Sequence, residues 1–365
     1  AFHIISIMKT IYKGSDSNFV VGKNIVKSKV CNERKTQTII FDDPPSVISR
    51  MAVVGEKEGK GPLSRYFQVV KGDDKNGEKT FEQAEIDMLE EALKCAADRL
   101  PGKLDDLDLI LSGDLLNQIT TSSYVCRNIN TPYLGIYSAC STLSESIGVA
   151  ACLLNAGYFS NIACCTASHF ATAERQYRYP LEYGCQRPPY AQWTATAAGC
   201  TILSNSYDSI IKVASATFGK VIDYGLRDLN NMGAAMAPAA MDSMIAFFID
   251  TNTRPEDYDL IVTGDLGKLG SDILRTIMKE KGYFLGRNYI DCGTMLYYSH
   301  QHCYQGASGA GCSASVINSF VFDKMESGEY NKVAYFATGA LMSTQSCYQG
   351  ETIPCISHGV SFVRR

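Results

Sequence analysis

Short apolar runs along this chain alternate with longer stretches in which apolar residues recur every three or four positions. The short runs predict buried strands and the longer stretches predict helices. One helix begins at a capping box of Thr80 and Gln83 and ends before Pro101. The expected strands are 47–54, 107–111, 133–137, 162–166, 195–204, 260–263, 288–291, 333–337 and 360–363, and the expected helices are 81–100, 141–156, a segment ending at 281 and a segment beginning at 313.

The chain contains a diverged copy of itself. Residues 108–115 read Asp-Leu-Ile-Leu-Ser-Gly-Asp-Leu, and residues 259–266 read Asp-Leu-Ile-Val-Thr-Gly-Asp-Leu. In the same order, the turn that contains Cys140 corresponds to the turn that contains Cys312. Because each pair places an apolar, β-rich run before a small-residue turn, the repeat indicates a duplicated α/β unit.

Three segments follow from the repeat. A lysine-rich arm spans residues 1–35, a first half spans 36–205 and a second half spans 206–365. The chain is 45% apolar and 20% charged, as in an ordinary soluble globular protein, so the halves can share one large core. A net charge of −4 argues against a general nucleic-acid-binding or polybasic membrane surface, because phosphate binding requires a positive field.

Fourteen cysteines are spread through the chain without the density or spacing of a small secreted disulfide framework, so we expect reduced thiols. The apolar segment 2–8 is too short to span a bilayer, and no other run reaches the length of a spanning helix. We therefore expect no transmembrane segment, and we expect any contact with a membrane to be made through a partner.

Cys140 lies where a predicted strand passes into a predicted helix. A thiol at such a turn is close to unpaired backbone N–H groups and to the positive end of the helix dipole, which lower its pKa and favour a nucleophilic thiolate. Cysteine is also a common packing residue, and Cys312 occupies the matching turn of the second half. Spacing alone leaves both interpretations of Cys140 open.

Several motifs show a resemblance to known families. The duplicated layout, the Ser-Ala-Cys-Ser-Thr turn at Cys140 and the Gly-rich segment 305–313 resemble the thiolase and β-ketoacyl-synthase superfamily. A more specific set resembles the stage V sporulation protein AD family of endospore-forming bacteria, from about Thr36 to the C-terminus. That set comprises residues 112–118, 167–176, 178–184, 236–240 and 353–360.

This resemblance implies a fold and a function. The fold is the five-layered αβαβα thiolase fold, made of two duplicated halves and usually dimeric. The function is binding of dipicolinic acid (pyridine-2,6-dicarboxylate) during its uptake into the developing spore, at the inner spore membrane and together with other stage V sporulation membrane subunits. A role in release on germination, and the presence of calcium with the ligand, stay open. We expect a homodimer formed along strand 162–166, interpreted as a sheet edge.

The sequence departs from the catalytic pattern of the superfamily. The resemblance places Cys140 at the nucleophile position, but condensing enzymes carry His or Asn where this chain has Gly264 and Asp265. Thiolases add a second cysteine where residues 338–341 read Thr-Gly-Ala-Leu, and His302 matches a superfamily histidine only with a longer spacing. We therefore expect a non-catalytic protein. The alternatives are an active acyltransferase or thiolase that uses Cys140, and a structural subunit that only holds membrane partners.

The expected ligand is a small aromatic dianion, and one loop carries suitable side chains. Arg175 and Arg178 have guanidinium groups that grip carboxylates, and Tyr183 and Trp193 can stack on a pyridine ring. These residue types also occur at surfaces and dimer contacts. His169 is expected at a strand end that faces the pocket. The candidate ligand-binding residues are Cys140, His169, Arg175, Arg178, Tyr183, Trp193 and Asn117. We expect no metal site and no cofactor, because no metal-ligand ladder, phosphate loop or dinucleotide motif occurs.

Overall fold

The computed structural model describes residues 18–21, 24–27, 36–178, 184 and 186–365. It divides into two compact units, residues 1–36 and 37–365. In the first unit, β1 (Asn18–Val21) pairs antiparallel with β2 (Asn24–Lys27). A short hairpin therefore lies in the segment for which the sequence predicted only a lysine-rich arm.

The larger unit is built on a 12-stranded mixed sheet. Its main path runs in the order β13 (Tyr289–Asp291), β12 (Leu260–Thr263), β15 (Lys332–Ala340), β16 (Cys355–Arg364), β11 (Ile211–Thr217), β4 (Ser46–Val54), β10 (Ala197–Ser204), β8 (Asn161–Ser168), β6 (Leu109–Asp114) and β7 (Tyr133–Gly135). Beside this path, β3 (Thr38–Ile40) pairs with β11 and β5 (Val69–Val70) pairs with β4. A separate parallel pair is formed by β9 (Trp193–Thr194) and β14 (Ala307–Ser308).

The strand order is the same in the two halves of the sheet. From one end, β13-β12-β15-β16-β11 are the third, second, fourth, fifth and first strands of their half, and β7-β6-β8-β10-β4 follow the same order from the other end. The two sets meet where Lys212 of β11 pairs with Ser46 of β4. This symmetry confirms the prediction of two duplicated halves.

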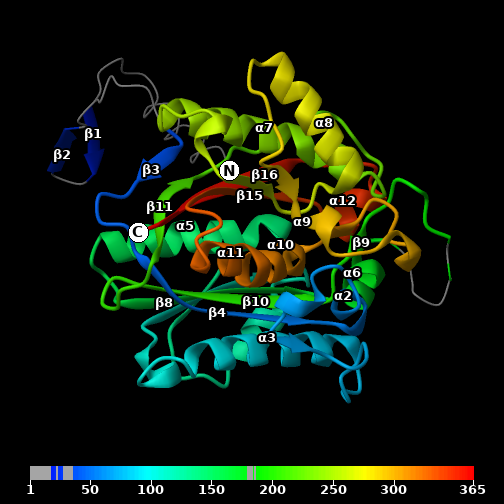
Figure 1. Cartoon of the computed structure of the whole chain (residues 1–365), viewed down its shortest axis with the longest axis horizontal. Coiled ribbons are helices and arrows are strands. Elements are labelled where there is room, and N and C mark those ends of the chain that lie inside the picture. Colours follow the sequence, from blue (N-terminus) through cyan, green and yellow to red (C-terminus); the bar gives the residue numbers. More distant parts are fainter. Residues whose placement is uncertain (1–17, 22–23, 28–35, 179–183, 185) are drawn as a thin grey trace, which may run out of the picture. The chain divides into compact units, whose positions relative to one another are not determined.

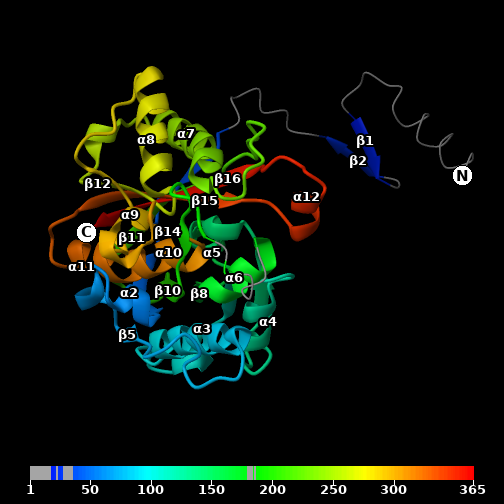
Figure 2. The ribbon, with the colours of Figure 1, turned by 90° about the vertical axis from the view of Figure 1, so that its right-hand side faces the viewer.

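Helices and strands of the larger unit stack in five layers (Figure 1). The outer helices are α7 (Met232–Asp250) and α8 (Gly267–Glu280) on one side and α3 (Phe81–Ala97) with α4 (Thr120–Cys126) on the other, and the middle layer contains α5 (Thr142–Asn155), α10 (Ala310–Val316) and α11 (Phe322–Glu326). In the view of Figure 2, the middle layer again separates the two sets of strands. The predicted αβαβα arrangement is therefore confirmed.

The predicted start of α3 is also confirmed. The Thr80 hydroxyl accepts a hydrogen bond from the Gln83 backbone N–H at 3.2 Å. The apolar stripe that follows, which includes Met88, Leu89 and Leu93, is buried against β4, β8 and β10. A capped helix with one apolar face therefore covers one side of the first half.

Strand β8 is not the sheet edge that the sequence predicted. It lies between β10 and β6, and the sheet ends at β7 instead. Every residue of β8 is buried, as expected for a central strand with helices on both faces. The apolar run that suggested an exposed, dimer-forming edge therefore fills the interior of the first half.

Helix α7 was not predicted. It is rich in Ala and Met, contains Pro238 and has no continuous polar face. Judged by length and composition, α7 is the one helix in the described part of the chain that is long and apolar enough to cross a membrane. However, 67% of its apolar stretch is buried, and the helix packs against α8, β15 and β16. It is therefore accounted for as an outer-layer helix of the core.

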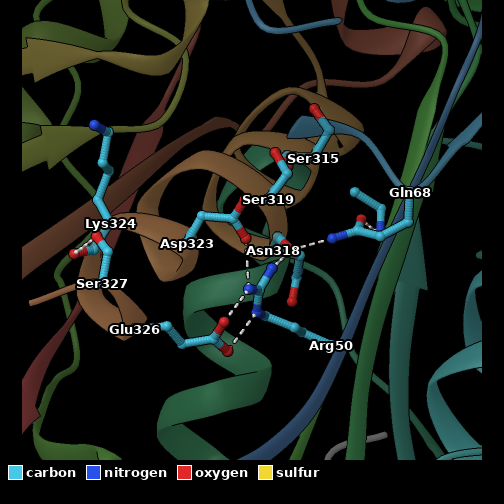
Figure 3. Close-up of polar contacts among 10 residues, drawn as sticks. Arg50, Gln68, Ser315, Asn318, Ser319, Asp323, Lys324, Glu326 and Ser327 are labelled. Atoms are coloured by element: carbon cyan, nitrogen blue, oxygen red, sulfur yellow. Dashed lines mark hydrogen bonds and ion pairs between the residues drawn. The ribbon is translucent and has the colours of Figure 1, made fainter. Parts of the chain in front are cut away.

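A buried arginine joins the two halves (Figure 3). Arg50 lies on β4, and its Nη1 donates to the backbone carbonyl of Asn318 at 2.9 Å, within the π-helical turn Ile317–Val321 between α10 and α11. Its Nη2 contacts Asp323 at 2.5 Å and Glu326 at 2.8 Å. One guanidinium of the first half thus holds the end of a helix from the second half.

Candidate functional site

A cavity opens beside the turn that leads into α5. It spans about 480 Å³ with the open solvent at its mouth included, and most of its walls are apolar. Helix α7 contributes Met232 and Met236, two of its buried methionines, to the apolar wall of the cavity. The polar side chains that line the cavity are Cys140, Arg178, Asp265, Thr194, Ser308, Tyr137 and Tyr177.

Cys140 lies in the short 3-10 turn Ala139–Ser141 that precedes α5. Burial raises the pKa of its thiol well above the ordinary value, and the neighbouring Asp265 carboxyl raises it further. The Gly309 backbone N–H and the charge of Arg178 oppose this effect but do not cancel it. The prediction of a lowered thiol pKa is therefore wrong, because desolvation and a nearby acid outweigh the helix terminus.

Asp265 follows β12, in the turn where the superfamily resemblance led us to expect a histidine or asparagine in condensing enzymes. Its side chain is 1% exposed, and its Oδ1 accepts a hydrogen bond from the Thr338 hydroxyl at 2.7 Å. Its Oδ2 accepts no hydrogen bond of ordinary geometry from the described residues, although the Cys140 thiol is close enough to lower the pKa slightly. Burial, together with the charge of Asp291, raises the pKa of Asp265 to about 7.

Comparison of the two halves shows what is unusual about Asp265. Its counterpart in the repeat, Asp114, accepts the backbone N–H of Leu116 at 2.9 Å on one oxygen and that of Ser122, in α4, at 2.7 Å on the other. In the second half, Asp291 accepts the backbone N–H groups of Leu266 and Gly267 on its two oxygens, both at 2.9 Å, and Gly267 is the repeat counterpart of Leu116. Asp291 thus replaces Asp265 in the turn and leaves the Asp265 carboxyl to face the cavity.

Gly264 also distinguishes this site. A Cβ atom placed on Gly264 would lie 3.0 Å from the Ala337 Cα and 3.4 Å from the Ser313 Cβ. These contacts are with backbone and short side chains, which cannot move aside easily. A side chain at position 264 would therefore be crowded by β15 and α10, whose atoms would have to shift by a few tenths of an ångström.

Arg178 is the candidate cation that lines the cavity. Its side chain is 6% exposed and contacts Glu174, which is 3% exposed. Arg187 approaches the same Glu174 carboxylate at 3.1 Å. Two guanidinium groups therefore share this carboxylate, which leaves each of them less completely neutralised than in a simple pair.

Arg175 and His169 do not reach the cavity. Arg175 is 43% exposed at the surface, where it pairs with Glu82 at 2.6 Å. His169 is buried, and both ring nitrogens are occupied: Nε2 contacts the Asp74 carbonyl at 2.7 Å, and Nδ1 accepts from the Ala171 N–H at 3.1 Å. His169 therefore caps α6 (Phe170–Tyr177), a helix inside the segment that the sequence predicted as a loop. This corrects the prediction that His169 faces the pocket.

Trp193 and Asn117 also lie outside the main cavity, and Tyr183 lies outside the described residues. The Trp193 ring stacks on Phe170 at 3.7 Å in a separate surface hollow. Asn117 lines an adjoining hollow that shares Tyr137, Tyr177 and Met342 with the cavity beside Cys140. The cavity therefore brings together Cys140 and Arg178 from the predicted set, and it adds Asp265.

None of the described histidines lines the cavity. His302 lines a different hollow, next to Lys268 and Tyr297. His358 is buried, and its Nδ1 accepts the Gly219 N–H at 3.2 Å. Among the described residues, no cluster of His, Cys, Asp or Glu has the arrangement of a metal site.

The sequence was compared with known proteins. Residues 35–363 match the family described as Stage V sporulation protein AD (SpoVAD). The chain is 43% identical over 328 residues to Stage V sporulation protein AD of Bacillus subtilis (strain 168), an alignment that covers 90% of this chain and 97% of that protein.

Solved structures with the same fold include a variant of Xanthomonas campestris OleA and a thiolase. The OleA variant matches with a TM-score of 0.56 at 11% identity, over 89% of this chain and 99% of that one. Human mitochondrial 3-ketoacyl-CoA thiolase in complex with CoA matches with a TM-score of 0.55 at 11% identity, over 91% and 100%. At this identity the likeness concerns the fold alone, and it confirms the thiolase-like architecture.

Proposed function

This chain belongs to the stage V sporulation protein AD family, and from this membership we propose that it is a non-catalytic protein that binds dipicolinic acid during its uptake into the developing spore. A role in sporulation follows from the family itself. The identity of the ligand rests on the motif resemblance. Two side chains that line the cavity support the proposal: the guanidinium of Arg178 and the thiol of Cys140.

The observation that carries the proposal is the buried guanidinium of Arg178 in the wall of a mostly apolar cavity. Its partner Glu174 is shared with Arg187, so an anion entering the cavity meets a cation that is largely removed from water and only partly neutralised. Methionines and tyrosines form much of the remaining wall and suit a flat aromatic ring. A small aromatic carboxylate satisfies both features.

The state of Cys140 argues against catalysis. Condensation and thiolysis need a thiolate with a positioned proton carrier. Here the pKa of the thiol is raised, and the residue that faces it is the acid Asp265. Gly264 itself has no side chain that could carry a proton.

An acyltransferase or thiolase remains the second candidate. It is favoured by the position of Cys140, which lines the cavity at the start of α5 in a fold shared with a thiolase. Assays with acetyl-CoA and acetoacetyl-CoA separate the two functions, because a binding protein turns over neither compound.

The proposal includes a homodimer that docks on other membrane subunits at the inner spore membrane, with no spanning segment of its own. Strand β7 ends the sheet and leaves one row of backbone groups unpaired by the sheet. Leu134, in the middle of β7, is 46% exposed. Pairing of two β7 strands across a twofold axis would cover both features.

Calorimetric titration tests the ligand. Dipicolinate should bind the purified protein more tightly than picolinate, which has one carboxylate. Arg178→Ala should weaken dipicolinate binding by about tenfold to a hundredfold, because a charge-assisted pair with a desolvated carboxylate is worth about 1.5–3 kcal/mol. Arg175→Ala is the matched control and should bind like the parent. Equal affinities for both ligands, or an unchanged Arg178→Ala, would contradict the proposal.

A further inference from the structure

We propose that Asp265 holds a carboxylate of the bound ligand as a neutral acid, so that the site takes up one proton together with the dianion. This inference rests on the proposed function, because it concerns the same cavity and the same ligand. It adds a residue that the sequence did not single out as a ligand contact and a direction of pH dependence.

The geometry gives Asp265 one oxygen for the ligand. Oδ1 is engaged by the Thr338 hydroxyl at 2.7 Å, whereas Oδ2 accepts no ordinary hydrogen bond from the described residues. The side chain is 1% exposed and lines the cavity. A buried carboxyl oxygen without an ordinary hydrogen bond is costly, and the Cys140 thiol that approaches this carboxyl is only a weak donor, so a polar atom of a ligand in the cavity would be a better partner.

The negative charge of the ligand requires that the Asp265 carboxyl be protonated. An ionised carboxyl can only accept hydrogen bonds, so it would repel a ligand carboxylate at contact distance. A protonated carboxyl donates one hydrogen bond to that carboxylate instead. The proton comes from solvent, and the unliganded site is already close to accepting it, because the pKa of Asp265 is raised to about 7.

The charges in the cavity lead to the same conclusion. A dianion beside an ionised Asp265 would place three negative charges in one cavity, and among the described lining residues Arg178 is the cation that faces them. Protonation of Asp265 removes one of the three. In a poorly hydrated cavity the state with fewer uncompensated charges is favoured.

Other titratable groups face Asp265 but do not provide the proton. The thiols of Cys140, Cys292, Cys312 and Cys355 and the phenol of Tyr335 all have raised pKa values and stay neutral near pH 7. The Tyr137 and Tyr177 phenols of the cavity wall behave in the same way. Asp291 has a pKa raised to about 6, but backbone N–H groups already occupy both of its oxygens.

The test is titration of the purified protein with dipicolinate between pH 6 and pH 8, in buffers with small and large ionisation enthalpies. Affinity should fall by about tenfold across this range, and at pH 8 the buffer dependence of the heat should report uptake of about one proton. Asp265→Asn keeps an N–H donor but cannot ionise, so its affinity should not change with pH. Glu58→Gln is the matched control, since Glu58 is buried, lies outside the cavity and has a pKa raised to about 7. It should retain the pH dependence of the parent.

The outcomes separate the two proposals. Binding of dipicolinate that does not vary with pH, with no proton uptake, would overturn the role of Asp265 and leave the proposed function standing. Binding that needs calcium and strengthens as pH rises would also overturn it, because Asp265 would then act as a carboxylate. Absence of binding at every pH would overturn the proposed function and this inference together. The buffer experiment uses the parent protein, so a misfolded Asp265→Asn does not prevent a decision.

Discussion

Replacement of Arg50 by methionine should lower the free energy of unfolding by about 2 kcal/mol. Methionine preserves much of the apolar stem and removes the guanidinium. The Asn318 carbonyl would lose the bond from Arg50 and keep the longer one from Gln68 Nε2, at 3.3 Å, and this partial loss of hydrogen bonding costs about 1–2 kcal/mol.

The ion pairs of Arg50 add less than their number suggests. The side chains of Asp323 and Glu326 are 37% and 52% exposed, so water solvates both carboxylates once the guanidinium is gone. Each pair is therefore worth at most about 0.5–1 kcal/mol. Burying the Arg50 guanidinium carries a desolvation cost, and its removal recovers that cost, which offsets part of the lost stability. The net loss in the free energy of unfolding is therefore about 2 kcal/mol, which is less than the loss expected when a fully buried ion pair is broken.

Equilibrium unfolding in urea measures this change through the transition midpoint and slope. Arg65→Met is the control, because Arg65 is exposed. Among the described residues, its side chain donates a hydrogen bond only to the hydroxyl of the neighbouring Tyr66, at 2.8 Å. It should leave stability unchanged. A loss smaller than about 0.5 kcal/mol for Arg50→Met, indistinguishable from an ordinary surface substitution, would refute the view that Arg50 holds the two halves together.

Three further predictions concern catalysis, assembly and pH. The protein should show no condensation or thiolysis with acetyl-CoA or acetoacetyl-CoA, and Cys140→Ala should fold nearly normally; turnover that vanishes in Cys140→Ala would restore the enzyme hypothesis. Light scattering should give a dimer mass, and Leu134→Lys on the β7 edge should shift the mass to the monomer; a monomer mass for the parent at all concentrations would exclude the dimer. Glu58 has a pKa raised from 4.5 to about 7, so its folded-state proton stabilises the protein fully below pH 4.5, and this contribution is lost as pH rises through about 7. The unfolding free energy of Glu58→Gln in urea should therefore fall less between pH 5 and pH 8 than that of the parent, and parallel curves would contradict the assignment.

The local pattern of residues determined much of the secondary structure. The strand at 260–263 has the predicted bounds, and α3 begins at the predicted cap, because alternation, periodicity and capping act within a few residues of each other. The repeat also indicated two similar halves. Helix α7 was missed because its apolar residues have no clear periodicity, and its packing neighbours come from distant strands.

The position of β8 shows a second limit of local patterns. An apolar strand is expected both in the middle of a sheet and at an edge that forms a dimer. Which of these applies depends on the strands beside it, and only the tertiary structure showed that β10 and β6 flank β8. The same holds for Arg175 and Arg178, three residues apart, of which one pairs at the surface and the other lines the cavity.

The site divides in the same way. The sequence indicated that Cys140 lies at a strand-to-helix turn and that Asp265 stands where a catalytic partner is expected. It could not show that the thiol pKa is raised, because desolvation depends on atoms from many segments. Nor could it show that Asp265 has an oxygen left over for the cavity. That depends on Asp291, which accepts the backbone N–H groups of the turn after Asp265, whereas Asp114 binds backbone N–H groups itself in the first half. This difference arises only once the strands lie side by side.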